Sequence, residues 1–277
     1  MINYTIYPIH IPSGKEYASL VKMCTDQLDY QGFVSLKNFL KPQHVDALIS
    51  SLLVLERKGV GFYSSERHNV FLDEIDSSSV SAMNEDSRSH PRHIQLKSSK
   101  LLISAKDLAP HTSHLENLFQ SRSFLNFIRD ILQVTVYPSS DEYGKYYANI
   151  FHEGDGLNFH FDRSEFSISL ILQPADEGGN FQFVPDSKQY VEEWQEIPLN
   201  LADLQAALDA SSTNNSVVHE PKLAAGDLYL FRGQNSLHRV SEIKKGKRIN
   251  VILTFNTEPN IVLNNYTLKK FFGVVRP

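Results

Sequence analysis

Cysteine is almost absent from this chain of 277 residues, in which Cys24 is the only one. A single thiol excludes an intramolecular disulfide and favours a reducing compartment, so we expect a cytoplasmic protein. The first residues also lack the charged and long apolar segments of a secretory signal peptide. Cys24 lies in an expected amphipathic helix, where it is best interpreted as a small core residue.

Long hydrophobic runs and an excess of positive charge are also missing. Without an apolar run of about 18 residues, no membrane-spanning helix is expected. The net charge of −5 lacks the basic footprint of a nucleic-acid-binding protein. The one basic run, residues 244–248, has Gly246 at its centre and apolar strands on both sides, so we interpret it as a hairpin turn.

Hydrophobic residues make up 41% of the chain, with 17 Phe and 12 Tyr, which is enough for a sizeable core. All-β barrels often reach this length as one domain. We therefore expect a single domain over residues 1–277. It would consist of a mixed helical and strand region at 1–133, a β core at 134–257 and a C-terminal extension at 258–277.

Three amphipathic helices are expected before residue 134, because apolar residues recur there at helical spacing. The second begins at a favoured first-turn proline, and the third begins at a capping box, Ser113–Glu116. A short strand follows the first helix. The expected ranges are Lys15–Asp29 for the first helix, Gly32–Leu36 for the strand, Pro42–Lys58 for the second helix, and Ser113–Leu132 with a break near residues 121–123 for the third.

Two insertions are expected near the mouth of a β core. Residues 76–91 are Ser-rich and polar, and a loop of this length is typically a lid, a binding loop or a disordered segment. Within Asn200–Ala210, four apolar residues share one helical face, which predicts a small helix between strands.

From residue 134 onward, short apolar runs alternate with turn signals, the pattern of a β-sandwich or barrel. Because eight such strands make a double-stranded β-helix, the strands expected here predict a mainly β fold with flanking helices, namely this cupin-like jelly roll. The N-terminal helices would pack on the outside of one sheet. The expected strands are Val134–Tyr137, Tyr146–Phe151, Phe159–Asp162, Phe166–Gln173, Asn180–Val184, Val217–Glu220, Asp227–Arg232, His238–Val240 and Arg248–Asn256.

His160 and Asp162 form a His-x-Asp pattern, whose side chains lie on one face of an extended backbone. A second histidine from a distant strand, His238, would complete two imidazoles and one carboxylate around a metal. This set is the facial triad of non-haem Fe(II) oxygenases. A His-x-Asp pattern also arises by chance in a chain with 11 His and 32 acidic residues, and the alternative is a structural histidine at each position.

The order and spacing of several motifs resemble the Fe(II)- and 2-oxoglutarate-dependent oxygenases over residues 134–257. The matching motifs are His160-x-Asp162, Gly178-Gly179, Gly226-Asp227, His238 and, ten residues later, Arg248. The stretch from Asn149 to Asp162 is similar to freestanding members that hydroxylate or halogenate small, amino-acid-like molecules. The resemblance implies Fe(II) at the triad, 2-oxoglutarate as co-substrate, and O2.

Arg248 is the best candidate to bind the distant carboxylate of 2-oxoglutarate, because a guanidinium donates two parallel hydrogen bonds. The alternative is a surface arginine at the end of a lysine-rich turn. Lys247 and Arg239 have the opposite strand parity and are expected to point away. Asn149 and Tyr147 share a strand face, and the resemblance implies a polar contact to 2-oxoglutarate there; an ordinary sheet amide is equally compatible with Asn149.

Asp162 also bears on the outcome of the reaction. In the halogenating members that the chain resembles, a small residue replaces this carboxylate and opens a position for halide. The acid therefore favours hydroxylation, or another oxidation without halide.

The expected substrate is a small molecule, such as a free amino acid or a related metabolite. One alternative is a protein side chain, as in prolyl hydroxylases, which needs an open groove. Another is a non-catalytic, cupin-like binding module, which has no use for a buried Arg248. The sequence does not determine the oligomeric state. Candidate substrate-binding residues, chosen by position near the iron or the mouth, are Arg92, Arg67, Asn158, Arg163, Asn250 and Thr254.

Overall fold

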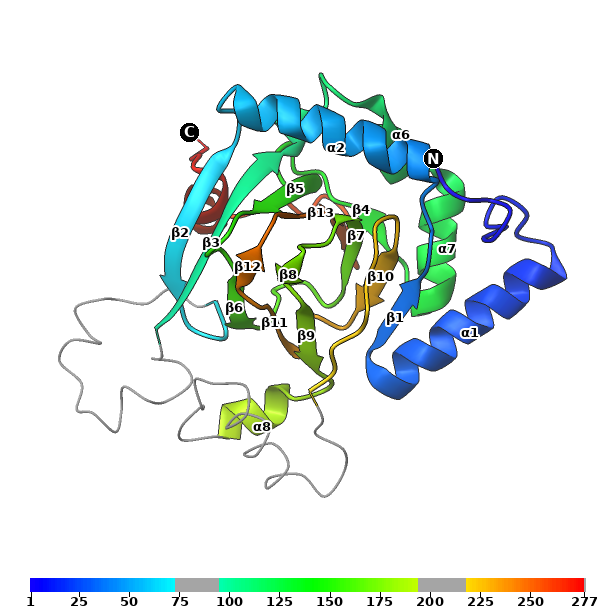
Figure 1. Ribbon diagram of the computed structural model, residues 1–277. Helices are drawn as coiled ribbons and strands as arrows, with labels where there is room; N and C mark the ends of the chain where they lie inside the picture. Colours follow the sequence, from blue (N-terminus) through cyan, green and yellow to red (C-terminus); the bar gives the residue numbers. More distant parts are fainter. Residues whose placement is uncertain (73–94, 194–217, 277) are drawn as a thin grey trace.

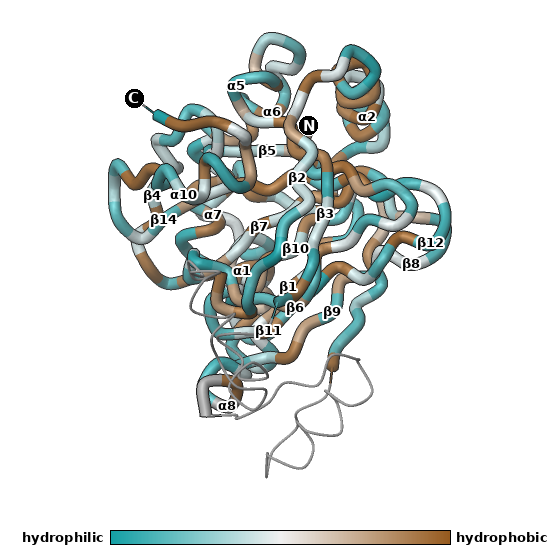
Figure 2. The backbone as a smooth tube through the Cα atoms, turned by 90° about the vertical axis from the view of Figure 1, so that its left-hand side faces the viewer, coloured by the Kyte–Doolittle hydropathy of each residue, from teal (hydrophilic) through white to brown (hydrophobic). Residues whose placement is uncertain are grey.

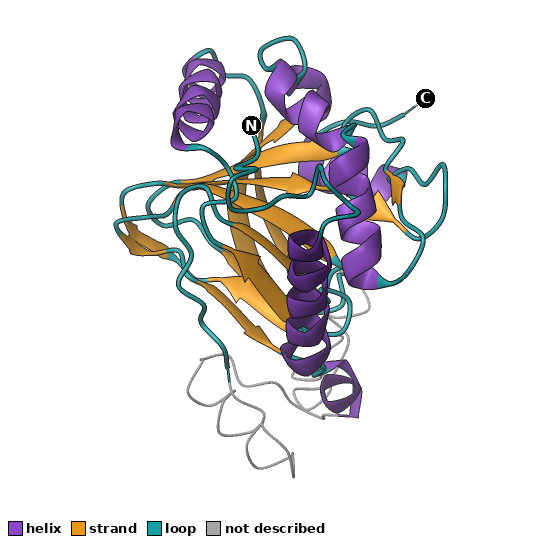
Figure 3. Cartoon of the chain, turned by 90° about the vertical axis from the view of Figure 1, so that its right-hand side faces the viewer, coloured by secondary structure: helices purple, strands orange, loops and turns teal. Residues whose placement is uncertain are grey.

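The computed structural model of the chain describes residues 1–72, 95–193 and 218–276. Its strands form antiparallel sheets at the centre of the molecule, and helices cover one side of them (Figures 1 and 3). The hydrophilic stretches include outer turns such as the one next to β12 (Ile243–Lys245) (Figure 2). No helix within the described ranges is long and apolar enough to span a membrane.

Two sheets build the jelly-roll core, as predicted. The larger sheet has the strand order β1 (Phe33–Leu36), β10 (Leu228–Phe231), β7 (Ser167–Gln173), β13 (Arg248–Leu253), β5 (Tyr146–Phe151), β3 (Leu96–Ser104) and β2 (Phe62–His68). The smaller sheet has the order β6 (Leu157–His160), β11 (Leu237–Val240) and β9 (Phe181–Val184). Two short pairs complete the strands: β12 with β8 (Glu177–Gly178), and β14 (Phe255–Asn256) with β4 (Tyr137–Pro138).

The N-terminal helices pack on the outer face of the larger sheet, which confirms the prediction. Buried side chains such as Leu28, Leu52 and Phe127 form one apolar cluster with Leu170 and Val251 of the sheet. In Figure 3, some of the helices lie in front of the strands. The helices of all described ranges, including those after the N-terminal region, are α1 (Lys15–Gln31), α2 (Pro42–Arg57), α5 (Ala105–Leu108), α6 (Ser113–Phe119), α7 (Arg122–Leu132), α8 (Lys188–Glu193), α10 (Asn265–Thr267) and the π-helix η1 (Leu268–Phe272).

The three long helices begin and end close to the predicted positions. Helix α1 ends at Gly32, whose φ of 66° is readily adopted by glycine. The predicted break between α6 and α7 is confirmed, and the Ser121 side chain caps α7. The capping box at Ser113 is wrong, because the N-cap is Thr112. The Glu116 carboxylate instead accepts a hydrogen bond from Tyr146 Oη at 2.6 Å.

Strand predictions hold best where apolar alternation is strong. The range of β5 is confirmed exactly as Tyr146–Phe151, and the other core strands begin or end within a few residues of expectation. The strand at Val134 is wrong, since β4 begins only at Tyr137. In the described part of Val217–Glu220, only an isolated bridge joins His219 to Phe183. The expected loop at 76–91 and helix at 200–210 lie outside the described residues.

Strands β1, β2 and β3 come from the N-terminal region but belong to the larger sheet. Neither β2 nor β3 was predicted. Strand β3 matters most, because it pairs with β5 and extends the wall of the core beside the predicted metal ligands. The domain division at residues 133 and 257 stays a prediction.

Candidate metal centre and co-substrate pocket

His160 and His238 face each other across a strand pair. His160 is the last residue of β6, and His238 is its direct partner on β11. Their ring centroids lie 4.1 Å apart, and each residue is 4% exposed. Cross-strand partners have adjacent side chains on one sheet face, so the pairing itself brings together two imidazoles that are far apart in sequence.

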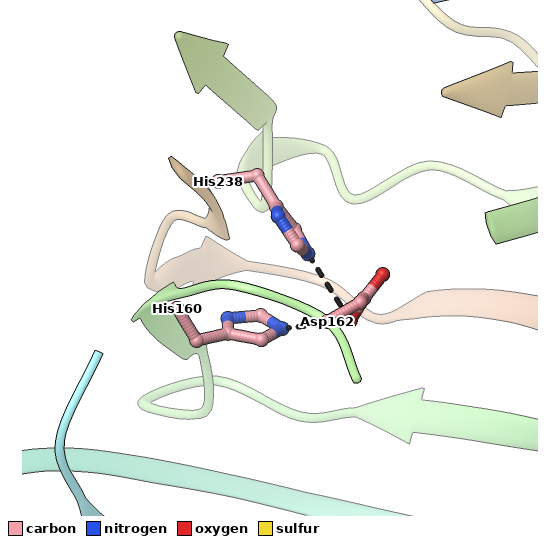
Figure 4. A group of neighbouring side chains, drawn as sticks. All are labelled: His160, Asp162 and His238. Carbon is pink, nitrogen blue, oxygen red and sulfur yellow. Dashed lines mark ion pairs between the residues drawn. The ribbon is translucent and has the colours of Figure 1, made fainter. Parts of the chain in front are cut away.

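Asp162 completes the group from a loop. The prediction extended the strand to Asp162, but β6 ends at His160. The backbone N–H groups of Phe161 and Asp162 instead donate to the carbonyls of Val70 and Gly233. The Asp162 Oδ1 atom still lies 3.5 Å from Nε2 of each histidine (Figure 4). The three ligand atoms lie within 4.8 Å of one another, as a shared metal requires.

Backbone carbonyls fix the orientation of both imidazoles. His160 Nδ1 lies 2.8 Å from the Asn158 carbonyl oxygen, and His238 Nδ1 lies 2.8 Å from that of Ser236. A carbonyl only accepts, so both Nδ1 atoms carry the proton and both Nε2 lone pairs point toward Asp162. This tautomer is the one that binds a metal through Nε2.

The electrostatics favour the metal-binding protonation states of His160 and Asp162. Burial, and next the charge that His238 would carry if protonated, lower the pKa of His160, which favours the neutral imidazole. Burial raises the pKa of Asp162, but the imidazoles of His238 and His160 outweigh it, because either ring, when protonated at Nε2, would attract and hydrogen-bond to the carboxylate. They hold the carboxyl pKa well below its ordinary value, so Asp162 is an anion.

The surroundings of Asp162 are fitted to a carboxylate. Ser167 Oγ donates a hydrogen bond to Asp162 Oδ2. On the other side lies Gly233, where an added Cβ would be 2.3 Å from Asp162 Oδ2 and 3.0 Å from its Cβ. Only a residue without a side chain at position 233 leaves room for the acid.

A cavity of about 210 Å³ lies beside the triad. Residues of both sheets line it, and so do Leu263, Thr267, Phe271 and Phe272 from the C-terminal segment that includes α10 and η1. The C-terminal extension, to which the sequence assigned no role, therefore forms part of the cavity wall.

Arg248 lines the cavity from β13 and is 3% exposed. Its Nη1 donates to Asn250 Oδ1 at 2.6 Å, and Asn250 Nδ2 donates to Ser169 Oγ at 2.9 Å. Burial lowers the pKa of Arg248, while a hydrogen bond with the Tyr229 hydroxyl opposes this shift. The expected alternative of a surface arginine is wrong.

The glycine pair at 178–179 makes room for this arginine. Gly179 has a φ of 65°, and an added Cβ would be 3.3 Å from Arg248 Cδ and 2.6 Å from Ile243 Cδ1. At Gly178, whose φ is 75°, a Cβ would be 2.1 Å from the Glu242 carbonyl oxygen. Both positions of the Gly178-Gly179 motif therefore require glycine, because backbone or side-chain atoms of other residues occupy the space of a Cβ.

Tyr147 and Asn149 also line the cavity, as expected from their shared strand face. Asn149 is directly opposite Asn250 in the β5–β13 pair. Its Oδ1 atom is buried without a hydrogen-bond partner in the described part of the chain. A buried amide with an unsatisfied oxygen is costly, and an assigned amide can also be turned to present its N–H2 group to a ligand.

The remaining candidates lie in different places. Thr254 and Arg163 line the cavity, but the Arg163 guanidinium is already hydrogen-bonded to the Leu72 carbonyl and to Thr267 Oγ1. Arg67 is exposed on β2, where alternation directs its neighbour His68 into the cavity instead. Asn158 contributes its backbone carbonyl to His160. Arg92 lies outside the described residues.

Lys247 and Arg239, which were expected to point away from the metal site, do so. Lys247 Nζ pairs with Glu56 at 2.7 Å, and Arg239 Nε donates to Gln182 Oε1 at 2.6 Å. Sequence reasoning missed other cavity residues, above all Lys100, His68 and Tyr229. Lys100 and His68 lie on the unpredicted strands β3 and β2, so no face was assigned to them.

Comparison with known proteins agrees with this geometry. A family model described as Halogenase D matches residues 85–267, which is most of the chain. The chain belongs to this family. No match was found among curated proteins.

Solved structures with the same fold have little sequence in common with the chain. An oxidoreductase of the 2OG-Fe(II) oxygenase family from Burkholderia pseudomallei is 13% identical, with a TM-score of 0.52 and coverage of 86% of this chain and 91% of that one. A prolyl hydroxylase from Trichoplax adhaerens, solved with a hypoxia inducible factor peptide fragment, is 14% identical, with a TM-score of 0.53 and coverage of 86% and 90%. AviO1 from Streptomyces viridochromogenes is 13% identical, with a TM-score of 0.52 and coverage of 86% and 95%.

The family match and the His-Asp-His group identify the class of enzyme. The protein is a 2-oxoglutarate-dependent Fe(II) oxygenase, and its cofactors are Fe(II), 2-oxoglutarate and O2. The side chains fit these groups: two imidazoles and one anionic carboxylate suit Fe(II), and the buried Arg248 suits a carboxylate. The chain is therefore an enzyme and not a cupin-like binding module.

We expect Gly233→Ala to weaken metal binding by displacing Asp162. The new Cβ would overlap the carboxylate, and disturbing the support of a metal ligand typically costs about 10–100-fold in affinity. Anaerobic titration with Fe(II) would measure this. Gly14→Ala is the control, because its φ of −78° suits alanine and no atom lies closer than 3.3 Å to its added Cβ. Equal iron affinity in both variants would contradict the role of Gly233.

Proposed function

We propose that this enzyme hydroxylates, or otherwise oxidises without adding halide, a small molecule such as a free amino acid or a related metabolite. In the hydroxylation, O2 supplies one oxygen atom to a C–H bond of the substrate. The other oxygen atom enters succinate as 2-oxoglutarate loses CO2. The observation that carries the choice of oxidation over halogenation is the Asp162 carboxylate beside the two histidines.

We assign roles to the chain's own residues on this basis. His160, Asp162 and His238 would hold Fe(II) on one face, and Arg248 would pair with the distant carboxylate of 2-oxoglutarate. Asn149 and Tyr147 would contact the same co-substrate from β5. Asn250 would act through Arg248, because its amide already binds both Arg248 and Ser169. When bound, iron and 2-oxoglutarate supply the O2-activating chemistry.

The size of the cavity supports a small substrate. Its volume of about 210 Å³ is below the roughly 300–1,000 Å³ of pockets for drug-sized ligands. Phe271 and Phe272 of η1 form part of the cavity wall. A protein side chain as substrate would need an open groove at this point, so we place that alternative second. Thr254 and Arg163 would be the substrate contacts nearest this wall.

The test of the proposed function is release of CO2 from 2-oxoglutarate with a panel of free amino acids and a proline-containing peptide. We expect iron-dependent release, stimulated by a free amino acid and abolished by His160→Ala and His238→Ala. Circular dichroism of both variants should match the unchanged protein, because the helices and sheets do not depend on the imidazoles. Stoichiometric, tight iron binding by both variants would contradict the triad, and stimulation by the peptide alone would favour the alternative substrate.

Arg248→Ala is expected to weaken 2-oxoglutarate binding by about 30-fold or more, because truncating one partner of a buried charge pair costs about 2–5 kcal/mol. Iron affinity should change little. The measurement is the Michaelis constant for 2-oxoglutarate together with an iron titration, with Lys245→Ala on the exposed part of β12 as control. An unchanged Michaelis constant would mean that another cation holds the co-substrate.

Asp162→Gly tests the choice between oxidation and halogenation. We expect the unchanged enzyme to transfer oxygen and no halide in chloride buffer. The variant should lose most hydroxylation, because it loses one ligand and one negative charge, with chlorinated product in traces at most. Mass spectrometry of the products decides the matter, and chlorinated product from the unchanged enzyme would show that Asp162 is not a ligand.

A further inference from the structure

Lys100 is a buried cation that the triad and Arg248 do not explain. It lies on β3, is 8% exposed and lines the same cavity as His160 and Asp162. Its Nζ atom lies 5.9 Å from the ring centroids of both Tyr147 and Phe271, at the limit of a cation–π contact. The ammonium therefore sits between β5 and the C-terminal helix η1.

Among the described residues, Lys100 has no hydrogen bond or ion pair, whereas the other two cations of the cavity are already engaged. Arg248 bonds to Asn250, and Arg163 bonds to Thr267 and to a backbone carbonyl. An ammonium without a partner is costly to bury. Burial lowers the pKa of Lys100 to about 8, although Asp162 opposes the shift. An anion in the cavity would offset this cost.

The charges of the cavity side chains, Fe(II) and 2-oxoglutarate together leave one positive charge without a negative partner. Of the charged groups that line the described cavity, Lys100 and Arg248 are buried, Asp162 is partly buried and Arg163 is exposed; the first three together carry one positive charge. The two positive charges of Fe(II) and the two negative charges of 2-oxoglutarate cancel. One positive charge therefore remains, and a single carboxylate would neutralise it.

Apolar side chains of one cluster line the cavity beside Tyr147, whose ring lies close to Lys100. Leu102, Leu263, Phe271 and Phe272 line this side of the cavity. In the described lining, Asp162 is the sole acidic side chain, and it belongs to the triad. This part of the wall therefore offers a cation for a carboxylate and apolar surface for a hydrocarbon chain.

We propose that Lys100 binds the carboxylate of the substrate, and that the rest of the substrate is an apolar chain lying along Leu102, Phe271 and Phe272. The proposal rests on the proposed function and narrows its substrate class to carboxylic acids with an apolar body. Arg248 remains the partner of 2-oxoglutarate.

The test uses two probes, L-norleucine and L-norleucinamide, which differ in the presence of the carboxylate. Their binding to the anaerobic enzyme loaded with Fe(II) and 2-oxoglutarate is measured by isothermal titration calorimetry. We expect the unchanged enzyme to prefer norleucine. Lys100→Met should weaken norleucine binding by about 30-fold or more and remove the preference, because a buried charge pair loses one partner. Lys100→Arg should restore the preference, which a purely structural role of Lys100 would not do.

The control is Lys97→Met, which removes an exposed lysine from the same strand and should leave the preference intact. The proposal is overturned if the unchanged enzyme binds neither probe, or if Lys100→Met retains the preference. It is also overturned if Lys100→Met instead loses 2-oxoglutarate affinity, since Lys100 would then hold the co-substrate. Iron-dependent CO2 release by the unchanged enzyme tests the proposed function separately from all of these outcomes.

Discussion

The pairing of β6 with β11 is the constraint on which the site depends. In this register His160 and His238 are direct partners, with ring centroids 4.1 Å apart. A shift of one residue in either strand would turn one imidazole to the opposite face of the sheet. Backbone carbonyls then set the tautomer of each ring, and the loop after β6 brings Asp162 to within 3.5 Å of both. The metal-binding geometry is thus a property of strand register, which the packing of the jelly roll fixes.

The charged side chains Asp162, Arg248 and Lys100 lie in three different parts of the cavity. Asp162 lies with the histidines, Arg248 projects from β13, and Lys100 projects from β3 on the other side of β5. Arg248 is held in one orientation by its hydrogen bond to Asn250, as suits a co-substrate that is always the same. Lys100 has no hydrogen bond or ion pair within the described part of the chain, its Nζ atom lies 5.9 Å from two aromatic ring centroids, and its four-carbon stem is flexible. The two cations thus differ in rigidity. The rigid Arg248 suits 2-oxoglutarate, which is the same in every reaction, and the flexible Lys100 suits the substrate.

The sequence was sufficient to predict that the three triad residues lie together and that Arg248 points inward. Those residues lie on or next to strands with strong apolar alternation and in an order typical of the family. It was insufficient for β3, where the polar residues Ser98, Ser99 and Lys100 are buried and break the expected pattern. Ser98 and Ser99 are hydrogen-bonded to His68, Asn158 and Asp155, and Lys100 lines the cavity; these surroundings come from elements distant in sequence. The C-terminal wall with Phe271 was missed for the same reason: its apolar residues pack against β2 and β3 across a gap of about 170 residues or more.

The family description names a halogenase, yet the neighbours of Asp162 are fitted to the acid. Ser167 Oγ donates a hydrogen bond to Asp162 Oδ2. The Asp162 carboxylate also occupies the space that a side chain at position 233 would need. Removing the acid alone would leave the Ser167 hydroxyl without its acceptor and a gap next to Gly233. Water would compete with halide for that gap, because the surrounding groups were arranged for a ligand fixed to the chain. We therefore expect that halogenation would require changes at several residues around position 162, and that a change at that position alone would not produce it.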